Sequence, residues 1–399
     1  MDAASLYASP NALAPHYSKF RVAERLLLTG HSHQAWPDVG FEAQSEAWLD
    51  AARYADDKWE HAFERAERVR AGFARLLGDA GGGIALAPNT HELVVRLISA
   101  LPLRERPKLV TTDGEFHTIR RQLDRLAEEG IEVARVAEAP LHSLSERLAR
   151  TVDDRTALVL VSAVFFDTGY IARGLADVAA RCRLHGARLL LDVYHALNVV
   201  PVSIGADGCG DAFVVGGGYK YCQLGEGNCF LRLPPDADLR PVITGWYSEF
   251  SALENTERSQ RVAYGTGGDR FAGATYDPTS HYRAAAVFRF FAEQRLDATL
   301  LRAVSQHQIG VLASEFDALG LDPAVVDRDR SAPLAEIGGF LALRSSNASG
   351  FARSLKDRGV FTDARGDVLR FGPAPYLSDR QLRDAMALLG EVARSSRRR

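Results

Sequence analysis

Lys220 is the residue whose type and setting point most directly to chemistry, because it follows three glycines and a tyrosine. Only five of the 48 basic residues are lysines, so a lysine at this position stands out. An arginine stays protonated, whereas a lysine amine becomes a neutral nucleophile when burial or a neighbouring charge lowers its pKa. Asp192 and His195 lie upstream, at the end of an apolar run. The pattern predicts a lysine that bonds covalently to an aldehyde cofactor, not a surface lysine in a glycine loop.

Pyridoxal phosphate is the aldehyde cofactor whose needs these residues match. The Lys220 amine would condense with its aldehyde, and the Asp192 carboxylate would keep its pyridine nitrogen protonated. An aromatic ring or an imidazole must cover the face of the cofactor, and Phe116 and His195 are the candidates. Either residue alone would more often belong to the core, so the prediction depends on their joint arrangement with Lys220.

The cofactor phosphate needs hydrogen-bond donors. Asn89 and Thr90 come directly before an apolar-periodic helix, where side chains and helix amides can bind an anion. Tyr219 and Thr275 could add hydroxyl groups. An ordinary helix cap is the simpler interpretation of Asn89 and Thr90 when they are taken alone.

From about residue 84 to residue 376, the chain resembles the class V aminotransferase group of fold-type I pyridoxal phosphate enzymes, and within it the kynureninase family. The segments that carry the resemblance are 115–118, 162–169, 192–196, 218–221, 245–247 and 369–376. They are similar to the family's segment with a ring-stacking Phe, its stretch ending in Tyr-Thr-Gly, its Asp-x-x-His-Ala and Ser/Thr-Tyr-Lys-Tyr motifs, its Gly-Trp-aromatic turn and its C-terminal arginine strand.

The resemblance implies further roles. Ser162 would supply another cofactor contact, and Trp246 and Thr275 would reach the cofactor of the other subunit in a homodimer. Arg370 would bind the α-carboxylate of an amino-acid substrate, a task that suits a planar guanidinium. Tyr219 would be a catalytic residue beside Lys220, as a proton donor or relay.

The sequence also departs from the family. The segment 273–278 reads Gly-Ala-Thr-Tyr-Asp-Pro, so an Asn that contacts kynurenine is missing and Thr275 fits phosphate binding instead. Ser248 and Glu249 follow the Gly-Trp-aromatic turn at 245–247, where members of the family usually have Gly-His. His31 and His33 form a His-x-His pair without a third ligand at suitable spacing, so we expect no metal site and a substrate-facing role for His33.

Short apolar runs alternate with amphipathic stretches through much of the chain, and this predicts an α/β fold with a mainly parallel sheet covered by helices on both faces. The predicted strands are 84–87, 108–112, 133–136, 157–162, 188–192, 212–215 and 229–232. Helices are expected at 118–129 and 174–185. Ligands bind such sheets at the carboxyl ends of the strands, where Asp192 lies.

The length of 399 residues suggests more than one domain. We expect an N-terminal segment 1–40, a large cofactor-binding domain 41–280 and a small C-terminal domain 281–399. The segment 41–77 reads as a long amphipathic helix that allows for one break. The small domain should hold helices at 281–296, at 297–319 and from 378, with strands at 340–344 and 368–371.

Composition restricts the partners. A net charge of −3 gives no reason to expect nucleic acid or an anionic membrane, and no segment is apolar enough to span a bilayer. The N-terminus lacks the features of a signal peptide. The four cysteines have no metal-binding spacing and are expected to be reduced thiols in a cytoplasmic protein.

The predicted function is hydrolysis of the kynureninase type. Kynurenine, 3-hydroxykynurenine or a related γ-keto amino acid would lose its Cβ–Cγ bond and give anthranilate, or an analogue, and L-alanine. A class V aminotransferase, lyase or epimerase acting on another small L-amino acid is the alternative. A non-catalytic binding protein is disfavoured because Lys220 and Asp192 are both present. A cysteine desulfurase is disfavoured because no cysteine follows Cys229.

Overall fold

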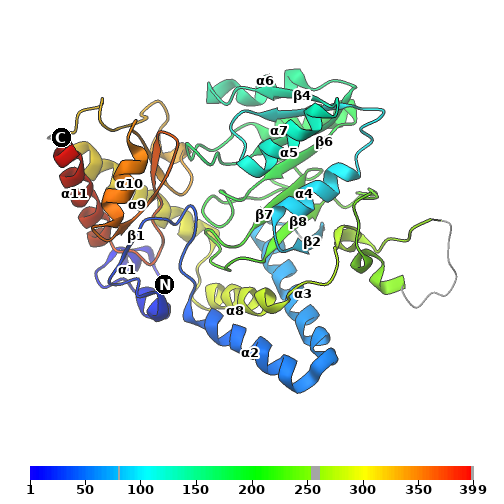
Figure 1. The fold of residues 1–399 in the computed structure, drawn as a ribbon, viewed down its shortest axis with the longest axis horizontal. Helices are drawn as coiled ribbons and strands as arrows, with labels where there is room; N and C mark the ends of the chain where they lie inside the picture. Colours follow the sequence, from blue (N-terminus) through cyan, green and yellow to red (C-terminus); the bar gives the residue numbers. More distant parts are fainter. Residues whose placement is uncertain (80, 253–260, 397–399) are drawn as a thin grey trace.

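The centre of the fold is a seven-stranded sheet built from buried aliphatic runs (Figure 1). In this computed structural model, which describes residues 1–79, 81–252 and 261–396, every residue of the strand Thr156–Ser162 is buried. The strand order is β2 (Gly83–Ala87), β8 (Cys229–Leu233), β7 (Phe213–Gly217), β6 (Arg188–Asp192), β5 (Thr156–Ser162), β3 (Lys108–Thr112) and β4 (Glu132–Val136). Neighbours pair in parallel except where β8 meets β2 and β7. The predicted sheet is confirmed, with strand boundaries within two residues of those expected.

Alternating side chains of each strand face two different cores, so helices cover both faces of the sheet. In β6, Leu189 and Leu191 belong to one core and Leu190 to the other. On the Leu190 face lie α4 (Thr90–Ser99) and α5 (His117–Glu128). On the opposite face lie α3 (Lys58–Leu76), α6 (Leu144–Thr151) and α7 (Leu175–His185). The predicted α/β class is therefore confirmed.

The carboxyl ends of β5 and β6 are in register, and they bring polar side chains to one edge of the sheet. Ser162 is the partner of Asp192 in the β5–β6 ladder. The next strand, β7, ends at Gly217, three residues before Lys220. The edge that the sequence predicted for the site is thus the edge where these strands end.

A second, smaller sheet follows α8 (Thr279–Glu293) and α9 (Ala298–Ala318), and its strands are antiparallel. Its order is β12 (Asp363–Arg365), β13 (Val368–Phe371), β10 (Leu341–Arg344) and β9 (Asp327–Arg328). The helices α10 (Ala348–Lys356) and α11 (Asp379–Ser396) complete this part, which lies on the left in Figure 1. The strands and helices expected after residue 281 are present, and β9, α10, β11 (Val360–Phe361) and β12 are additions.

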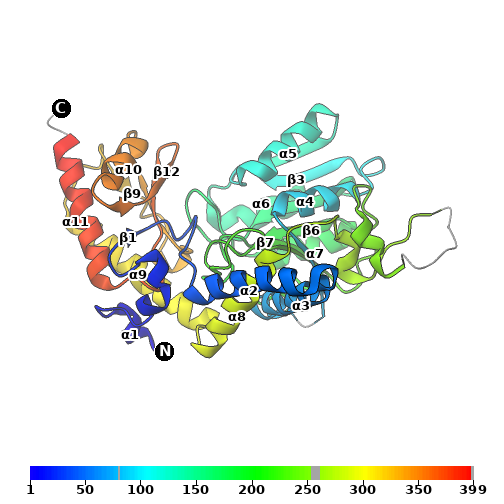
Figure 2. The same cartoon turned by 60° about the horizontal axis from the view of Figure 1, so that its bottom comes forward.

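The N-terminal segment joins this smaller part, and α1 (Ala3–Tyr7) and α11 lie on the same side of the molecule (Figure 1). Its strand β1 (Leu26–Leu27) pairs in parallel with β11, and α1 contacts α9. The long N-terminal helix has the break that the sequence allowed for, which divides it into α2 (Asp38–Tyr54) and α3, and α2 lies alongside α8 (Figure 2). The domain boundaries near residues 40 and 280 stay predictions. Within the described ranges, no helix has the length and apolar character needed to cross a bilayer.

Candidate active site

Lys220 lies in a short turn that follows β7, and the glycines before it allow the backbone to approach its neighbours closely. A Cβ at Gly217 would clash with the Tyr194 ring and with the Cys229 sulfur. Gly218 is similarly close to Leu224. Side chains at these positions would therefore displace the lysine or the residues around it.

The Lys220 amine is buried among aromatic rings. Its Nζ lies 2.7 Å from His195 Nε2 and 4.7 Å from the centroid of the Tyr194 ring. The rings of Phe116 and Tyr219 follow at 5.6 and 5.7 Å. Lys220, His195, Phe116 and Tyr219, predicted from the sequence to share a site, are thus brought together.

The environment favours a neutral amine at position 220. Burial lowers the pKa of Lys220 from 10.5 to about 7, against the raising effect of the Asp192 carboxylate, and the Arg370 guanidinium lowers it as well. Burial and the charge of Lys220 hold the pKa of His195 well below its ordinary value. His195 is therefore neutral near pH 7, and a substantial fraction of Lys220 is an unprotonated nucleophile.

Asp192 is a buried carboxylate placed to receive a cation. Its Oδ1 accepts a hydrogen bond from the backbone N–H of Tyr194 at 2.8 Å. Burial raises the pKa of Asp192, whereas that hydrogen bond and the charge of Lys220 lower it. A protonated ring nitrogen would favour the ionised carboxylate, so Asp192 fits the position opposite a pyridinium.

Ser162 lies beside Asp192, and its hydroxyl is held by Glu115, a residue to which sequence reasoning gave no role. The Ser162 Oγ donates to Glu115 Oε2 at 2.6 Å, and Thr112 Oγ1 donates to Glu115 Oε1 at 2.7 Å. Burial raises the pKa of Glu115 to about 7, and these hydrogen bonds only partly oppose it. The Ser162 side chain is thereby fixed at the end of β5.

Tyr219 stands between Tyr194 and the exposed His33. The His33 ring stacks on Tyr219 with centroids 4.7 Å apart and planes at 21°, and its Nε2 lies 3.4 Å from Glu226 Oε1. Burial raises the pKa of Tyr219, so its hydroxyl keeps its proton at neutral pH. This arrangement suits a proton donor near the surface, with His33 on its outer face.

Arg370 is buried in β13 and is bound by Asp363, its cross-strand partner in β12. The guanidinium donates from Nε to Asp363 Oδ1 at 2.9 Å and from Nη2 to Asp363 Oδ2 at 2.6 Å. Its Nη1 donates to the carbonyl oxygen of Phe166 at 2.7 Å. The arginine is close enough to lower the pKa values of Lys220 and His195, so it belongs to the same site.

Asn89 and Thr90 begin α4, where the structure shows helix capping. The Asn89 side chain accepts from the backbone N–H of Glu92 at 3.0 Å and donates to the Glu92 carboxylate at 3.2 Å. The amide end of α4 nevertheless adjoins the site, because Cys229, next to Thr90, lies 3.6 Å from the Tyr194 hydroxyl. A phosphate role for Asn89 and Thr90 stays a prediction.

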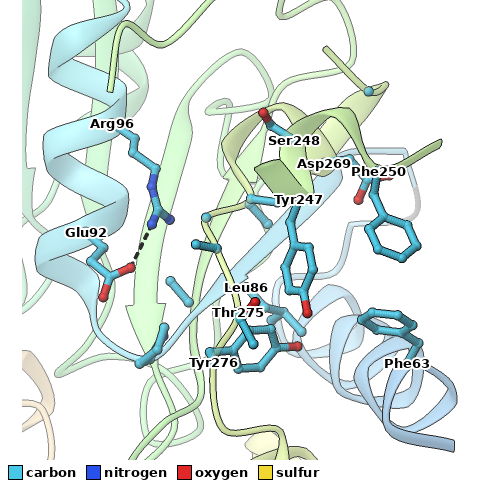
Figure 3. Close-up of a pocket in the computed structure, with 18 of the residues that line it drawn as sticks. Phe63, Leu86, Glu92, Arg96, Tyr247, Ser248, Phe250, Asp269, Thr275 and Tyr276 are labelled. Carbon is cyan, nitrogen blue, oxygen red and sulfur yellow. Dashed lines mark hydrogen bonds and ion pairs between the residues drawn. The ribbon is translucent and has the colours of Figure 1, made fainter. Parts of the chain in front are cut away.

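Trp246 and Thr275 lie in segments that adjoin a different cavity, of about 500 Å³. The backbone N–H of Tyr247 donates to Gly273 O at 3.0 Å, which joins the two segments. Figure 3 shows Tyr247 and Thr275 in this cavity, with the Arg96–Glu92 ion pair on the α4 side. Within the described part of the chain, no recorded contact joins Trp246 or Thr275 to the cluster around Lys220. These two predicted cofactor contacts are not brought to the site of their own chain.

Three residues of the cluster were missed by sequence reasoning: Glu115, Tyr194 and Asp363. Glu115 and Tyr194 stand inside motifs whose neighbours were assigned, so their proximity to the site was available as a signal. Asp363 could have been found from the Gly366-Asp367 pair, which is typical of a two-residue hairpin and places residues 363 and 370 opposite each other. Among the described residues, no group of three or more His, Cys, Asp or Glu side chains could hold a metal ion.

Curated relatives align over most of the chain. No protein-family model matches it. An uncharacterized aminotransferase of Bacillus subtilis is 23% identical over 85% of this chain and 87% of its own length. The kynureninase of Pseudomonas fluorescens is 26% identical over 96% of this chain and 92% of its own, and a Xanthomonas oryzae kynureninase is 28% identical over 81% and 79%.

Solved structures share the fold at low sequence identity. C-DES, crystallised with glycine covalently linked to its PLP cofactor, superposes with a TM-score of 0.81 at 16% identity, over 94% of this chain and 98% of its own. A cysteine desulfurase of Thermococcus onnurineus has a TM-score of 0.77 at 16% identity, over 93% and 95%. These likenesses establish that the fold is that of the fold-type I pyridoxal phosphate enzymes.

Proposed function

Because this chain is a kynureninase-like member of the class V aminotransferase group, we propose that it is a pyridoxal phosphate-dependent hydrolase of the kynureninase type. It cleaves the Cβ–Cγ bond of L-kynurenine or a related γ-keto amino acid. One water is consumed: its oxygen enters the carboxyl group of the aryl acid, and Cβ receives a proton to give L-alanine. The observation that carries the proposal is the buried Lys220 amine, held among aromatic rings beside Asp192.

The residues present fit the cofactor. Lys220 supplies an amine with a pKa of about 7, Asp192 supplies a buried carboxylate, and Phe116 and His195 supply flat faces near the amine. When bound, pyridoxal phosphate accepts the electron pair that remains on Cα of the amino acid. Ser162 and the amide end of α4, with Asn89 and Thr90, complete the proposed contacts.

Lys220 is the proposed general base. With the cofactor bound to the substrate amine, the Lys220 Nζ would be free to take the Cα proton, and a pKa of about 7 suits a group that must both accept and return a proton near neutral pH. His195, neutral and 2.7 Å away, holds Nζ in place without adding charge. Tyr219 keeps its hydroxyl proton and is the proposed donor to the leaving carbon.

Arg370 is the proposed ligand of the substrate α-carboxylate, and His33, exposed on the outer face of Tyr219, is the proposed contact to the rest of the substrate. Trp246 and Thr275 are proposed to serve the cofactor of a second subunit in a homodimer, since no contact among the described residues joins them to the Lys220 cluster of their own chain. The four cysteines are free and buried, as expected of the cytoplasmic location that we propose.

A class V aminotransferase, lyase or epimerase is the alternative, and one observation favours keeping it. The segment Gly273-Ala274-Thr275 lacks the Asn of the family, and Thr275 lies instead in the cavity beside Tyr247. A desulfurase is disfavoured, because burial raises the pKa values of Cys182, Cys209, Cys222 and Cys229 and so suppresses the thiolates that such chemistry requires.

The test is to incubate the purified protein, loaded with pyridoxal phosphate, with L-kynurenine and to follow anthranilate fluorescence. We expect fluorescence to rise with time, and no rise with Lys220→Ala. Cofactor absorbance near the visible edge that disappears on borohydride reduction identifies the covalent lysine link. Absorbance without anthranilate, together with keto-acid production from small L-amino acids, would favour the aminotransferase instead.

A further inference from the structure

The arginine proposed to bind substrate is already engaged by a carboxylate of its own chain. Asp363 and Arg370 are directly opposed on β12 and β13, and the carboxylate binds the Nε and Nη2 edge of the guanidinium with contacts of 2.9 and 2.6 Å. Burial alone would raise the pKa of Asp363, but hydrogen bonds and charge from His31 and Arg370 hold it well below its ordinary range. Asp363 is therefore ionised throughout the neutral pH range.

His31 completes this unit from the N-terminal segment. Its Nε2 lies 2.7 Å from Asp363 Oδ1, and its ring is almost wholly buried against Phe340, with centroids 4.9 Å apart. Burial lowers the pKa of His31 to about 4, so at neutral pH the ring is neutral and its Nε2–H donates to Asp363. One member of the His-x-His pair thus faces Asp363, while His33 faces outward.

The geometry leaves part of Arg370 available. A guanidinium has five N–H donors. One on Nε and one on Nη2 go to Asp363, and one on Nη1 goes to Phe166 O. Within the described residues, one N–H on each terminal nitrogen has no recorded acceptor. Two such donors are what a second carboxylate needs for an end-on, two-point contact.

We propose that Asp363, supported by His31, is a positioning residue that holds Arg370 with its two terminal N–H donors directed at the substrate α-carboxylate. This inference rests on the proposed function. It also gives a role to His31, the member of the His-x-His pair that the proposed reaction does not use. Asp363 does not compete with the substrate, because its carboxylate binds the edge of the guanidinium formed by Nε and Nη2 and not the edge formed by Nη1 and Nη2.

Electrostatics and entropy both support positioning. An unpaired guanidinium in a buried site carries a large desolvation cost, which Asp363 offsets before substrate arrives. A side chain held by three hydrogen bonds also loses little conformational freedom when the ligand binds. Removing Asp363 should therefore weaken carboxylate recognition and leave recognition of the amino group unchanged.

The experiment compares two probes that differ by the carboxylate: L-alanine and ethylamine, each titrated into the holoenzyme while cofactor absorbance is followed. Arg370→Ala gives the reference for complete loss of carboxylate recognition. We expect Asp363→Ala to weaken L-alanine affinity by about 10- to 100-fold, the range expected for lost hydrogen bonds to charged groups. Ethylamine affinity should change by less than about twofold, since its binding uses none of these contacts.

Two further variants separate positioning from general damage. His31→Gln keeps a donor near the Nε2 position and should retain most of the L-alanine affinity that His31→Ala loses. The matched control is Asp367→Asn, which lies in the same hairpin but forms a surface ion pair with Arg344 at 3.1 Å; it should change neither probe.

The outcomes are distinct. Tighter L-alanine binding in Asp363→Ala would mean that Asp363 competes with the substrate, and would overturn the inference. Equal losses for L-alanine and ethylamine would show a structural role and would overturn it as well. Either result would leave the proposed function standing. A wild-type protein without cofactor absorbance would instead contradict the proposed function.

Discussion

The Lys220 amine is a nucleophile because of what surrounds it, and this gives it a testable pH dependence. In the unfolded chain a lysine titrates near 10.4, whereas burial places the pKa of Lys220 at about 7. The folded state therefore disfavours the charged amine, and the neutral fraction rises from about a tenth at pH 6 to about nine tenths at pH 8.

We expect the rate at which apoprotein attaches pyridoxal phosphate to rise with pH through about 7 and to level off above about pH 8, where nearly all of the amine is neutral. Stopped-flow absorbance over a pH series measures this rate. Lys220→Arg should show no attachment at any pH, because arginine stays protonated. A rate that continues to climb toward pH 10 would mean that the lysine is not perturbed.

Glu115 provides a second prediction, which concerns how the folding stability depends on pH. Its pKa is raised by burial to about 7, so the folded state binds a proton that the unfolded state loses above about pH 4.5. The stability that this group contributes is complete below pH 4.5 and is lost as the pH rises through 7. The total is at most about 3 kcal/mol per chain, on the basis of the size of the shift.

Glu115→Gln should therefore have a melting temperature close to that of wild type at pH 5 and higher than wild type at pH 8. Glutamine resembles the protonated acid and keeps an oxygen for Ser162 and Thr112. Calorimetric melting of both proteins at the two pH values is the measurement. Glu146→Gln, at an exposed site paired with Arg150, is the control and should show no such pH-dependent gain. Equal differences at both pH values would contradict the prediction.

Helices and strands explain why much of the site could be predicted from sequence. Runs such as Leu189-Leu190-Leu191 are apolar without alternation, which indicates a strand buried on both faces, and Asp192 at the end of such a run must lie at the carboxyl edge. The turn Gly216–Lys220 follows the next strand in the same sheet. These local signals therefore placed Lys220, Asp192, His195 and Phe116 correctly relative to one another.

What local signals could not give is pairing between distant segments. His31 meets Asp363 across more than three hundred residues of chain, and Arg370 reaches the carbonyl of Phe166, 204 residues away. Glu115 reads as a surface residue by composition, and its burial follows only from the packing of β3 against β5. Nothing in the spacing of His31 and Asp363, or of Phe166 and Arg370, indicates that these groups touch.

The close approach of β6 and β7 leads to a further prediction. A Cβ at Gly217 would overlap the Tyr194 ring, which is itself packed beside the Lys220 amine. Gly217→Ala should weaken pyridoxal phosphate affinity by about tenfold, as expected from an overpacking cost of 1–3 kcal/mol. Gly210→Ala is the control, since nothing lies within 4 Å of its Cβ. Equilibrium dialysis of both variants measures the affinity, and equal values would contradict the prediction.

At the scale of the whole molecule, apolar side chains are exposed close to the segments that we propose to serve a second subunit. Val242, Ile243 and Trp246 are 81%, 52% and 45% exposed, and all three lie in the segment that leads to the cavity holding Tyr247 and Thr275. An exposed apolar cluster of this kind indicates an interaction surface. If the surface is a dimer interface, each active site would combine Lys220 of one chain with Trp246 and Thr275 of the other.

Mixed dimers test that arrangement. Lys220→Ala and the double variant Trp246→Ala, Thr275→Ala should each be inactive alone, but random reassortment of equal amounts makes half of the dimers mixed. Each mixed dimer then has one site with the wild-type Lys220, Trp246 and Thr275, so kynurenine hydrolysis should return to about a quarter of the wild-type rate, in proportion to intact sites. The control mixture pairs Lys220→Ala with Asp192→Ala, whose lesions fall in residues of the same chain's site, and it should stay inactive. Recovery in both mixtures or in neither would contradict a site shared in this way.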